Sequence, residues 1–594
     1  MSEIAPLPPH LTGASFLLRE AAPAEIFTPE DLTPEDRQMA GTAAKFMDKE
    51  VFPQLDALEH QEPGLARKLF EQAGELGFLG IEMPEDCGGL GLGKTTAIGV
   101  NEQLSRLGGF GITCGVQTGI GSQPLIYFGT DAQKQQYLPR LATGEWMGAY
   151  CLSETGSGSD ALGMKARAVL TPDGKHYLLN GVKMWITNAG WADLFTVFAK
   201  VDGQHVTAFL VERTFPGVST GKEEHKLGIK SSSTRRLILE DVKVPVENVL
   251  GEVGKGAYIA FNILNFGRYS LGAGILGAAK DQIRVAAKYA LERQQFGKPL
   301  AAFGLIQQKL GDMMAKVFAG ESATHRTAGL IDAVAATGEK LDAMRPPFLR
   351  SLDEFALECS IVKVRCSEIL FEVADESLQI HGGYGFTEEF SPARALRDSR
   401  INRIFEGTNE INRLFIPSLL TRREQRGRFP LAQTIASTFM ELARADAPPA
   451  DGGDDLQSTR ALLGGAKRLV FFLSGLMGRK FGAKLNDEQE VLAALADVIA
   501  EIYLAESAVL RALKTRAGGA KDSIQADLAV LYTHDAVARM EAGARRVLEA
   551  SVERREFGAQ VQTVRRLLAW TPPNTIALRR KAARHACDRG GYSV

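Results

Sequence analysis

The spacing of apolar and polar residues divides the chain into helical and strand-like regions. Over residues 33–148, apolar residues recur every three or four positions, as in DRQMAGTAAKFMDKEVFPQL, and this period predicts amphipathic helices. Over residues 149–249, short β-branched and aromatic runs predict strands, with a Pro-Asp-Gly hairpin turn at 172–174. Helical periodicity returns over residues 257–422. The pattern therefore predicts a mainly α chain with a central β domain.

The remaining segments differ from these regions in composition. Residues 1–28 are rich in proline and lack periodicity, which predicts an extended N-terminal arm. The sequence DAPPADGGDD at 446–455 predicts a linker, and a further helical region follows it. The predicted organisation is an arm (1–28), an N-terminal helical domain (29–148), a β domain (149–250), a helical bundle (251–430), a linker (431–457) and an extra helical domain (458–594).

Composition and charge narrow the class of protein. Of 594 residues, 45% are hydrophobic and 24% are charged, as in ordinary globular proteins. The 69 Lys+Arg and 71 Asp+Glu give a formal net charge of −2, which argues against a chain built to bind nucleic acid. The six cysteines are scattered without metal-ligand spacing, so we expect no metal site and a reducing compartment. Because no signal-peptide pattern and no uncharged apolar run of about 18 residues occurs, we expect a cytoplasmic protein without a membrane span.

One motif points towards a different class of protein. Residues 88–95 match the phosphate-loop pattern G-x-x-x-x-G-K-[ST], in which Lys94 would neutralise phosphates and Thr95 would hold magnesium. A phosphate loop follows a buried strand, but Glu85 and Asp86 precede this one, and two carboxylates would repel a triphosphate. We therefore interpret the motif as a glycine-rich turn between helices, with a nucleotide hydrolase as a distant alternative.

Three clusters far apart in the sequence carry the candidate chemistry. The segment YCLSETGSGSD at 150–160 can present backbone amides to a planar ligand or a diphosphate. The segment MWITN at 184–188 offers an aromatic ring face and a hydroxyl at the end of a strand. The third cluster joins a glycine turn, QIHGGYGF at 379–386, to a carboxylate in RIFEGTNE at 403–410. Taken singly, each cluster is equally consistent with a loop, a core tryptophan or a solvated glutamate.

Together these clusters resemble the acyl-CoA dehydrogenases. The segments YCLSETGSGSD, NGVKMWITNAG, ERQQFGKPL, QIHGGYGF and RIFEGTNEINRLF occur in the order of that family over about residues 30–420. The additional C-terminal residues resemble the very-long-chain branch. The resemblance implies a helical domain, a β-barrel-like domain, a helical bundle and a C-terminal helical domain. It also implies FAD-dependent oxidation of long or very-long-chain acyl-CoA to trans-2-enoyl-CoA in fatty acid β-oxidation, with electrons passing to electron-transferring flavoprotein.

The resemblance assigns the catalytic base and the substrate contacts. Glu406, in FEGT, matches the base that removes the α-proton, and burial should raise its pKa towards working pH. Its backbone N–H matches a donor to the thioester oxygen, where negative charge develops. Some relatives place the base on the helix near 264–268, but residue 267 is glycine here, so Glu406 has no rival. The substrate-binding residues implied are Asn265, Phe266, Gly267, Arg268, Phe405 and Gly407.

The resemblance also assigns the FAD contacts. For the ring and the diphosphate it implies Cys151, Leu152, Ser153, Ser159, Trp185 and Thr187; for the FAD of a neighbouring subunit it implies Arg293, Phe296, Gln379 and Gly383; beside the adenosine half it implies Thr408 and Glu410. Sites shared between subunits imply at least a dimer. We expect a homodimer, because an added helical domain could cover the surface that shorter relatives use to form tetramers.

Two segments bear on the acyl chain and on membranes, and each has two interpretations. GGFGITCGVQTGIG at 108–121 lacks large polar residues, so its glycines predict either a deep channel for long acyl chains or close helix packing. AKRLVFFLSGLMGRKFGAKL at 466–485 mixes apolar and basic residues, which predicts either peripheral contact with an anionic membrane or a core helix with a solvated basic face.

A short repeat and two alternative functions complete the predictions. The hexapeptide ERQQFG at 292–297 recurs as ERREFG at 553–558, which indicates either a diverged second copy of the helical bundle or chance. An acyl-CoA oxidase that passes electrons to oxygen is one alternative function. A non-catalytic assembly protein on the same fold is the other, and an intact Glu406 argues against it as the sole role.

Overall fold

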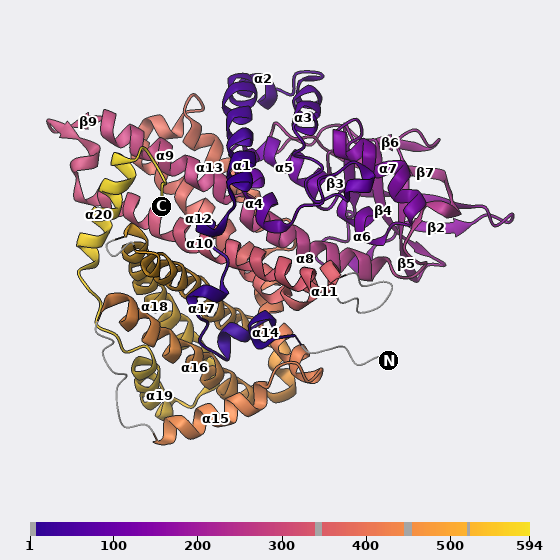
Figure 1. Cartoon of the computed structure of the whole chain (residues 1–594). Helices are drawn as coiled ribbons and strands as arrows, with labels where there is room; N and C mark the ends of the chain where they lie inside the picture. The colour runs from indigo at the N-terminus through magenta and orange to yellow at the C-terminus, as the bar shows by residue number, and fades with distance from the viewer. Residues whose placement is uncertain (1–6, 339–346, 445–453, 520–522) are drawn as a thin grey trace.

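The computed structural model describes residues 7–338, 347–444, 454–519 and 523–594. In Figure 1 the β domain lies at the right, the central helical bundle in the middle, and the extra helical domain below it at the lower left. The predicted class, mainly α with a central β domain, is confirmed.

The N-terminal helices pack against the β domain and the central bundle. Their bounds are α1 Pro34–Phe46, α2 Leu55–Glu59, α3 Leu65–Glu75, α4 Lys94–Leu104, α5 Gly108–Thr118, α6 Gln123–Phe128 and α7 Asp131–Thr143. Capping side chains set two of the starts: the hydroxyl of Thr33 accepts a hydrogen bond from the backbone N–H of Asp36 at 3.1 Å, and Thr130 does the same for Gln133 at 3.2 Å.

The phosphate-loop match is structural. The Lys94 side chain is only 2% exposed, forms an ion pair with Glu82, and lies 3.8 Å from the centroid of the Phe266 ring. The backbone N–H groups of Lys94 and Thr95 each donate to the carboxylate of Asp332 at 2.9 Å. These amides already bind an anion of the protein itself, and the predicted glycine-rich turn between helices is confirmed.

The β domain contains an eight-stranded sheet in the order β6-β7-β3-β2-β4-β5-β8, with β1 paired to β4. The strands are β1 Gly148–Cys151, β2 Arg167–Leu170, β3 His176–Thr187, β4 Leu194–Val201, β5 His205–Glu212, β6 Val218–Thr220, β7 Thr234–Pro245 and β8 Val249–Leu250. Strands β2 and β3 pair antiparallel, with Leu170 opposite Tyr177, which confirms the hairpin predicted at 172–174.

The central bundle is built around α12, Ala356–His381, which is buried over most of its length. The other helices are α8 Gly256–Gly274, α9 Leu276–Glu292, α10 Gly304–Ala336, α11 Pro347–Glu354, α13 Ser391–Arg400 and α14 Asn409–Gln425. A small hairpin of β9, Gln294–Gln295, and β10, Lys298–Pro299, projects between α9 and α10. Because α8 and α14 both pack on α12, this helix holds the two segments that carry the site.

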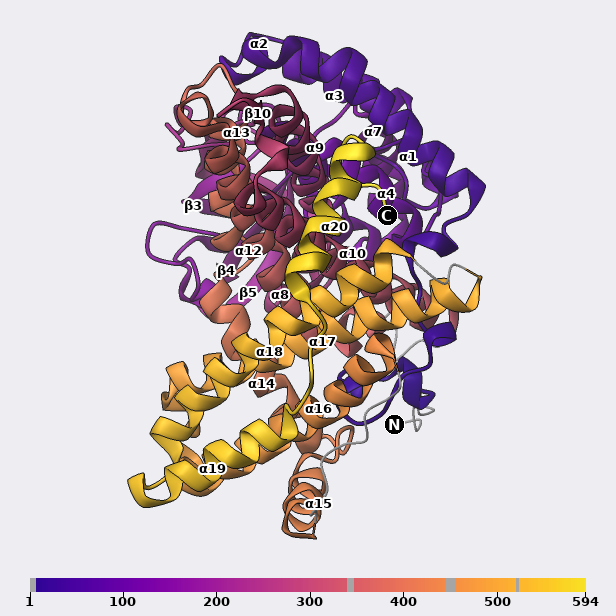
Figure 2. The same ribbon diagram turned by 90° about the vertical axis from the view of Figure 1, so that its left-hand side faces the viewer.

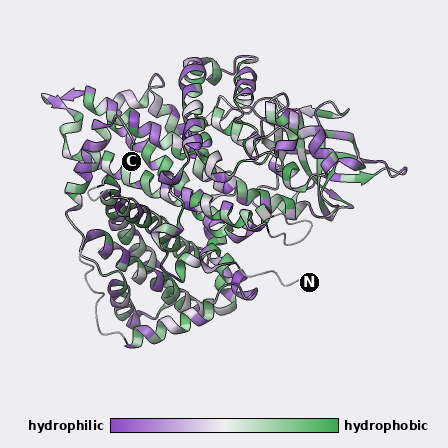
Figure 3. Cartoon of the chain, in the orientation of Figure 1, coloured by the Kyte–Doolittle hydropathy of each residue, from purple (hydrophilic) through white to green (hydrophobic). Residues whose placement is uncertain are grey.

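The extra domain consists of long amphipathic helices, along which hydrophobic and hydrophilic residues alternate (Figure 3). They are α16 Asp455–Phe481, α17 Gln489–Ala517, α18 Ile524–Ser551, α19 Arg554–Leu567 and α20 Thr575–Asp588. After α19 the chain turns back, and α20 lies along α10 of the central bundle (Figure 2). The extra domain therefore covers one side of the central bundle.

The predicted linker is wrong over its first half. Residues 431–444 form a helix, α15 Leu431–Arg444, instead of a flexible connection. Leu431, Ile435 and Phe439 are four residues apart and pack against the core that contains α16, so burial of this apolar stripe orders the segment. The rest of the predicted linker falls largely on 445–453, outside the described residues.

The prediction of an extended arm is also wrong. Residues 1–6 lie outside the described part, but from residue 7 onward the arm folds into four short 3-10 turns, at Pro9–Leu11, Ser15–Leu17, Pro23–Glu25 and Pro29–Asp31. Phe16 and Leu17 are buried, and the Phe16 ring lies 4.8 Å from that of Tyr503 on α17. Isolated turns have no period, so these tertiary contacts were not visible in the pattern.

A buried ionic cluster joins the two ends of the chain to both bundles. Arg511, on α17, pairs with Glu30 of the arm at 2.8 Å and with Glu321 of α10 at 2.5 Å. The hydroxyl of Tyr592, near the C-terminus, donates to Glu321, and Lys280 of α9 pairs with it at 2.6 Å. Four parts of the molecule therefore depend on one another at this cluster.

The hexapeptide repeat does not mark a common local structure. Residues 292–297 end α9 and begin the β9–β10 hairpin, where Phe296 and Gly297 have φ of +52° and +76°. Residues 553–558 begin α19, and Gly558 lies inside that helix. The two copies have different backbones, so the match does not support a duplicated element.

The basic apolar helix is a core helix. Among the described residues, one stretch, Asp455–Asp487, is long and apolar enough to cross a membrane, and 67% of its most apolar window is buried inside the molecule. Leu469, Phe472 and Leu473 of α16 are buried, whereas Arg479 and Lys480 are exposed. This is the arrangement expected of a core-facing helix with a solvated basic face.

Candidate active site

Glu406 lies in a strained loop between two helical segments. It follows the 3-10 turn Ile401–Arg403 and precedes α14, where the hydroxyl of Thr408 accepts a hydrogen bond from the backbone N–H of Ile411 at 3.3 Å. Glu406 and Gly407 both have left-handed backbones, with φ of +58° and +78°. A non-glycine residue in this region is strained, and such strain persists only where surrounding contacts hold it.

Four polar contacts hold this loop. The buried ammonium of Lys363, on α12, donates to the carbonyl oxygen of Gly407 and to Oδ1 of Asn409, each at 2.7 Å. Nδ2 of Asn412 donates to the same Gly407 oxygen at 2.8 Å, and Nε of Arg268 donates to the Glu406 carbonyl oxygen at 3.4 Å. Lys363, Asn412 and Arg268 thus each donate to a backbone carbonyl oxygen of the strained loop, at Gly407 or Glu406.

The carboxylate of Glu406 is enclosed and only partly compensated. Its Oε2 is buried and has no hydrogen-bond partner among the described residues. Burial raises the pKa of Glu406 to about 7, although the positive charges of Arg268 and Lys363 oppose the rise. A carboxylate that takes up a proton near neutral pH can act as a general base.

Gly267, on α8, faces this carboxylate. A Cβ atom at position 267 would lie 2.5 Å from Oε2 of Glu406, closer than atoms can approach. A side chain at 267 is therefore excluded while Glu406 occupies this position, which gives a physical reason for the glycine at the site where some relatives place the base.

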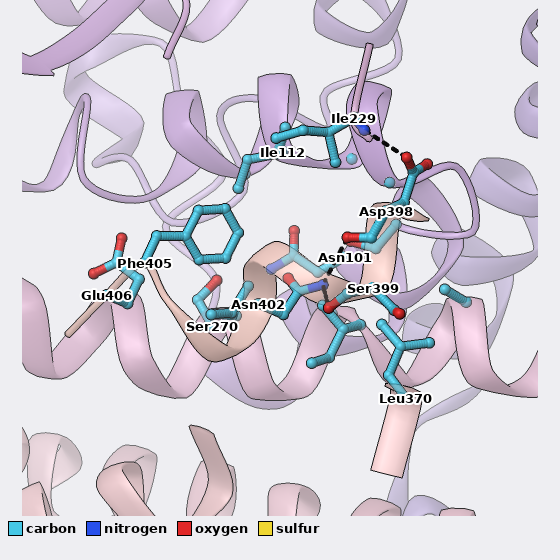
Figure 4. Close-up of a pocket in the computed structure, with 18 of the residues that line it drawn as sticks. Asn101, Ile112, Ile229, Ser270, Leu370, Asp398, Ser399, Asn402, Phe405 and Glu406 are labelled. Atoms are coloured by element: carbon cyan, nitrogen blue, oxygen red, sulfur yellow. Dashed lines mark hydrogen bonds between the residues drawn. The ribbon is translucent and has the colours of Figure 1, made fainter. Parts of the chain in front are cut away.

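A long pocket extends from Glu406 between the helices (Figure 4). It encloses about 990 Å³ of empty space, part of it open to solvent, and Phe266, Gly267 and Phe405 line it beside Glu406. From there it follows α8 and α9 as far as Gln282, a distance of about 22 Å at the helical rise. Of the other predicted substrate residues, Asn265 accepts from Nη1 of Arg268 at 2.8 Å, and Gly407 lies next to Glu406.

The glycines of α5 serve both predicted purposes. Gly108, Gly111, Gly115 and Gly119 all line the pocket. A Cβ on Gly111 would meet Cα of Ser105 at 2.5 Å, so this glycine permits close packing. Gly119 caps the end of α5, and a Cβ there would lie 3.2 Å from the Phe266 ring. A Cβ on Gly115 would meet nothing within 4 Å. Close packing therefore accounts for Gly111, whereas Gly115 leaves open space in the pocket.

The β domain places the predicted flavin contacts next to α8. Cys151 and Leu152 are buried at the end of β1, and the backbone N–H of Met184 donates to the Ser153 oxygen at 2.9 Å, which joins the first cluster to the second. Trp185 has φ of +55° and is 58% exposed, so its ring face is free to contact a planar group. Thr187 ends β3, opposite Thr234.

A buried ion pair supports this surface. The ammonium of Lys183 is fully buried and lies 2.7 Å from Oε1 of Glu154. Glu154 in turn accepts from the backbone N–H groups of Lys165 and Ala166, at 2.7 and 3.0 Å. The pair fixes the loop that carries exposed Ser159, and no Cβ contact within 4 Å restricts Gly156 or Gly158 there. A rigid, glycine-rich loop beside an exposed indole fits a flavin and its diphosphate.

The residues predicted to reach a second FAD lie elsewhere. Arg293, Gln379 and Gly383 line a separate surface cleft beside the β9–β10 hairpin, and Phe296 on that hairpin is 92% exposed. Figure 1 places this hairpin at the end of the molecule opposite the β domain. One FAD cannot contact both sets within a single chain. Thr408 and exposed Glu410 lie instead at the start of α14, next to the Glu406 loop.

Sequence reasoning missed the residues that support the site. Lys363, Asn409 and Asn412 hold the Glu406 loop, and Lys183 and Glu154 hold the flavin-side loop. A charged residue inside an otherwise apolar helical run, as in SIVKVRC around Lys363, was a signal that could have been used, because a buried lysine needs a partner.

Comparison with known proteins gives the family. The chain matches the acyl-CoA dehydrogenase N-terminal domain over residues 33–145, the middle domain over 149–242 and the C-terminal domain over 254–419, and a further acyl-CoA dehydrogenase C-terminal domain model over 465–566. A probable acyl-CoA dehydrogenase of Bacillus subtilis is 45% identical over 592 residues, which cover 98% of each chain. This chain therefore belongs to the acyl-CoA dehydrogenase family.

Two further relatives bear on the cofactor and on the branch. The crystal structure of an acyl-CoA dehydrogenase from Bacillus anthracis complexed with FAD matches with a TM-score of 0.96 and 45% identity, over 98% of this chain and 100% of that one. The very long-chain specific mitochondrial enzyme of Mus musculus is 40% identical over 391 residues, 64% of this chain and 56% of that one. The protein is thus an FAD-dependent acyl-CoA dehydrogenase, with the extra C-terminal domain that was predicted.

Proposed function

We propose that this enzyme dehydrogenates long-chain acyl-CoA between Cα and Cβ and that Glu406 removes the α-proton. The observation that carries the proposal is the Glu406 carboxylate, with its enclosed and unpartnered Oε2 at one end of a pocket that continues along α8 and α9. This oxygen accepts no hydrogen bond from the described residues and is free to accept a proton from a bound ligand.

The properties of Glu406 suit proton abstraction from a weak carbon acid. With a pKa of about 7, its conjugate base is stronger than an exposed carboxylate and is still substantially ionised at neutral pH. FAD, when bound, supplies the oxidant that takes up the hydrogen lost from Cβ. The backbone N–H of Glu406 makes no hydrogen bond within the described residues, so it remains available to the thioester oxygen, where charge develops.

Two groups of residues would hold FAD. Within one chain these are Cys151, Leu152, Ser153, Ser159, Trp185 and Thr187, with Thr408 and Glu410 beside the adenosine half. Arg293, Phe296, Gln379 and Gly383 would contact the FAD of a second copy, because they lie at the opposite end of the molecule. This arrangement fits a homodimer, because residues of the second copy would then complete each FAD site.

The length of the pocket supports a long acyl chain. Ile112 and Val116 on α5 and Ser270 and Leu271 on α8 line its middle, and no large side chain fills the space at Gly115. The mitochondrial relative that matches two thirds of the chain is named for very long chains, in agreement with this proposal.

The proposal also covers the electron acceptor and the cellular location of the protein. We take electron-transferring flavoprotein as the acceptor from the family resemblance, and the cytoplasm as the location because the scattered cysteines favour a reducing compartment. Peripheral contact with an anionic membrane stays a prediction. It rests only on the exposed basic residues Arg468, Arg479 and Lys480, because the apolar side of α16 is already packed.

The test is a visible spectrum of the purified protein, followed by anaerobic addition of CoA thioesters of graded length. We expect bound FAD that is bleached most efficiently by hexadecanoyl-CoA and poorly by butyryl-CoA. A preference for butyryl-CoA contradicts the long channel, and absence of bleaching by every thioester contradicts the proposed reaction. Turnover that consumes oxygen without an added acceptor identifies an oxidase instead.

A further inference from the structure

The far half of the pocket mixes polar side chains with apolar ones such as Ile275, Ala278 and Leu370. Beyond Ile112, the polar side chains include Asn101 of α4, Ser105 directly after α4, Gln282 of α9 and Arg394 of α13, with Ser270 of α8 at the middle of the pocket. Figure 4 shows Asn101 and Ser270 beside the empty space. Four helices therefore bring hydrogen-bonding groups into a part of the channel where an unsubstituted hydrocarbon chain would leave these groups without partners.

These groups are not satisfied by the protein. Within the described residues, the side chains of Asn101, Ser105, Ser270 and Arg394 make no hydrogen bond or ion pair. Gln282 is only 4% exposed; its Oε1 accepts from the hydroxyl of Ser377 at 3.0 Å, but its amide nitrogen donates to no protein group. Asn101, Ser105, Ser270 and Arg394 are half-buried, so these polar groups face the pocket and depend on water or a ligand for their hydrogen bonds.

The charges at this end leave Arg394 available. Arg106 also lines the pocket, but it pairs with Asp48 at 2.8 Å and with Asp281 at 3.3 Å. The Asp398 carboxylate accepts from the backbone N–H of Ile229, and burial raises its pKa to about 6. Arg394 lies one helical turn before Asp398 without touching it, so its guanidinium keeps free donors towards the pocket.

A methyl terminus would fit this end badly. A saturated chain that fills the pocket would take the water away from Asn101, Gln282 and Arg394 without replacing their hydrogen bonds. An oxygen atom at the end of the chain could accept hydrogen bonds from the same donors and would restore them.

We propose that the far end of this pocket is a polar subsite for acyl-CoA whose chain carries oxygen at its distal terminus, as a hydroxyl or a carboxylate. The subsite rests on the proposed function, because it uses the same channel. The span of about 22 Å from Gly267 to Gln282 means that only long chains reach it. The distal oxygen is held there while the thioester end lies at Glu406.

The test compares hexadecanoyl-CoA, 16-hydroxyhexadecanoyl-CoA and hexadecanedioyl-CoA on the FAD-loaded enzyme. We expect the oxygen-bearing substrates to have kcat/KM values about tenfold above the unsubstituted one. In Gln282→Leu and Arg394→Met the preference should disappear or invert, through a change in KM and not in kcat. Ile112→Leu, in the same pocket but without a polar group, should keep the preference.

Binding without turnover separates this inference from the proposed reaction. Dissociation constants of the three thioesters are measured on Glu406→Gln, alone and combined with Arg394→Gln, a milder change in case Arg394→Met fails to fold. Tighter binding of the oxygen-bearing thioesters, lost with Arg394→Gln, supports the subsite whether or not the reaction is as proposed. Equal binding of all three thioesters, or a preference for hexadecanoyl-CoA, overturns the proposed subsite and indicates that water alone occupies the far end of the pocket. A preference for the dioyl over the hydroxy thioester identifies the carboxylate as the ligand.

Discussion

Two carboxylates, one in the central bundle and one in the extra domain, meet their surroundings in opposite ways. In the central bundle, Glu406 has a buried oxygen without a partner among the described residues, and burial raises its pKa to about 7. In the extra domain, Glu501 of α17 is buried, but Arg365 of α12 and Arg539 of α18 lie at 2.9 and 2.8 Å and outweigh the effect of burial, so its pKa falls to about 2.

This difference distinguishes a carboxylate that can take part in catalysis from one that stabilises the fold. A charge compensated on all sides holds helices together and does not readily change its protonation. A charge left partly uncompensated in a strained loop is costly to the fold but can exchange a proton with a ligand. The extra domain stabilises the bundle that carries the reactive carboxylate, and the following changes test that division.

The largest effect is expected from removing the base. Glu406→Gln keeps the shape of the side chain but cannot take up the α-proton, so turnover should fall by about 10²- to 10⁴-fold. Anaerobic bleaching of FAD by hexadecanoyl-CoA measures the loss, and the spectrum of the resting protein shows whether FAD remains bound. Bleaching at a near-normal rate with FAD in place would exclude Glu406 as the base.

The next effect comes from crowding the carboxylate. Gly267→Ala places a methyl group where Oε2 of Glu406 lies, so the carboxylate must move and kcat should fall by about 10²-fold with FAD retained. Gly115→Ala is the matched control, because its new methyl group meets nothing within 4 Å in the same pocket. Equal kcat values for the two variants would contradict the tight approach of Gly267 to Glu406.

A compensated charge should affect stability instead. Glu501→Gln removes one carboxylate from buried Arg365, which keeps Glu368 at 2.7 Å, and removes the partner of half-buried Arg539. The free energy of unfolding should therefore fall by about 2 kcal/mol in a denaturant titration. Glu549→Gln removes only an exposed pair with Arg545 and should cost less than about 0.5 kcal/mol.

The pH dependence of stability checks the same residue. Because the folded-state pKa of Glu501 is about 2 against an ordinary value of 4.5, its contribution is complete above pH 4.5 and is lost as the pH falls towards 2. Glu501→Gln should lack this part of the acid destabilisation. A variant with the same acid profile as the wild type would mean that Glu501 is not held by its arginines.

The smallest effect is expected from removing the positive charge of Lys363, which holds the Glu406 loop. In the wild type, kcat/KM should rise with pH through about 7, as Glu406 loses its proton. Burial lowers the pKa of Lys363 itself to about 7, so its charge, which favours the ionised carboxylate, weakens over the same pH range. Lys363→Met should therefore raise the pKa of Glu406 only slightly and move this limb to higher pH by less than about one unit. Lys363→Arg keeps a charge and should restore the limb; an unmoved limb in Lys363→Met would show that the charge does not act on Glu406.

The sequence predicted the parts of the fold that have a period or a turn signal. The helical regions and the hairpin at 172–174 are confirmed, because amphipathic spacing and Pro-Asp-Gly act locally. The predictions of an extended arm and of a linker at 431–444 were wrong. Contact with the distant helix α17 orders Phe16 of the arm. The linker was predicted from the acidic Pro-Gly stretch after α15, although Leu431, Ile435 and Phe439 form an apolar stripe.

The residues of the site also fall into those that a local sequence pattern identified and those that no local pattern could identify. The motif FEGT located Glu406, and the absence of a side chain at 267 was readable directly. Lys363 reaches the carbonyl of Gly407 across 44 positions, and Lys183 reaches Glu154 across 29, so no local pattern could pair them. The polar end of the pocket was hidden for the same reason, since Asn101, Gln282 and Arg394 come from three separate helices.

The ionic cluster that joins both ends of the chain has a consequence for biosynthesis. Arg511 and Glu30 are 481 residues apart, so the arm meets its partner only after α17 has been translated. Until then Phe16 and Leu17 lack their cover, a situation in which nascent chains call on chaperones. A chain that ends before α17 would leave Phe16 and Leu17 uncovered, so we expect it to be cleaved by proteases more readily than the full chain.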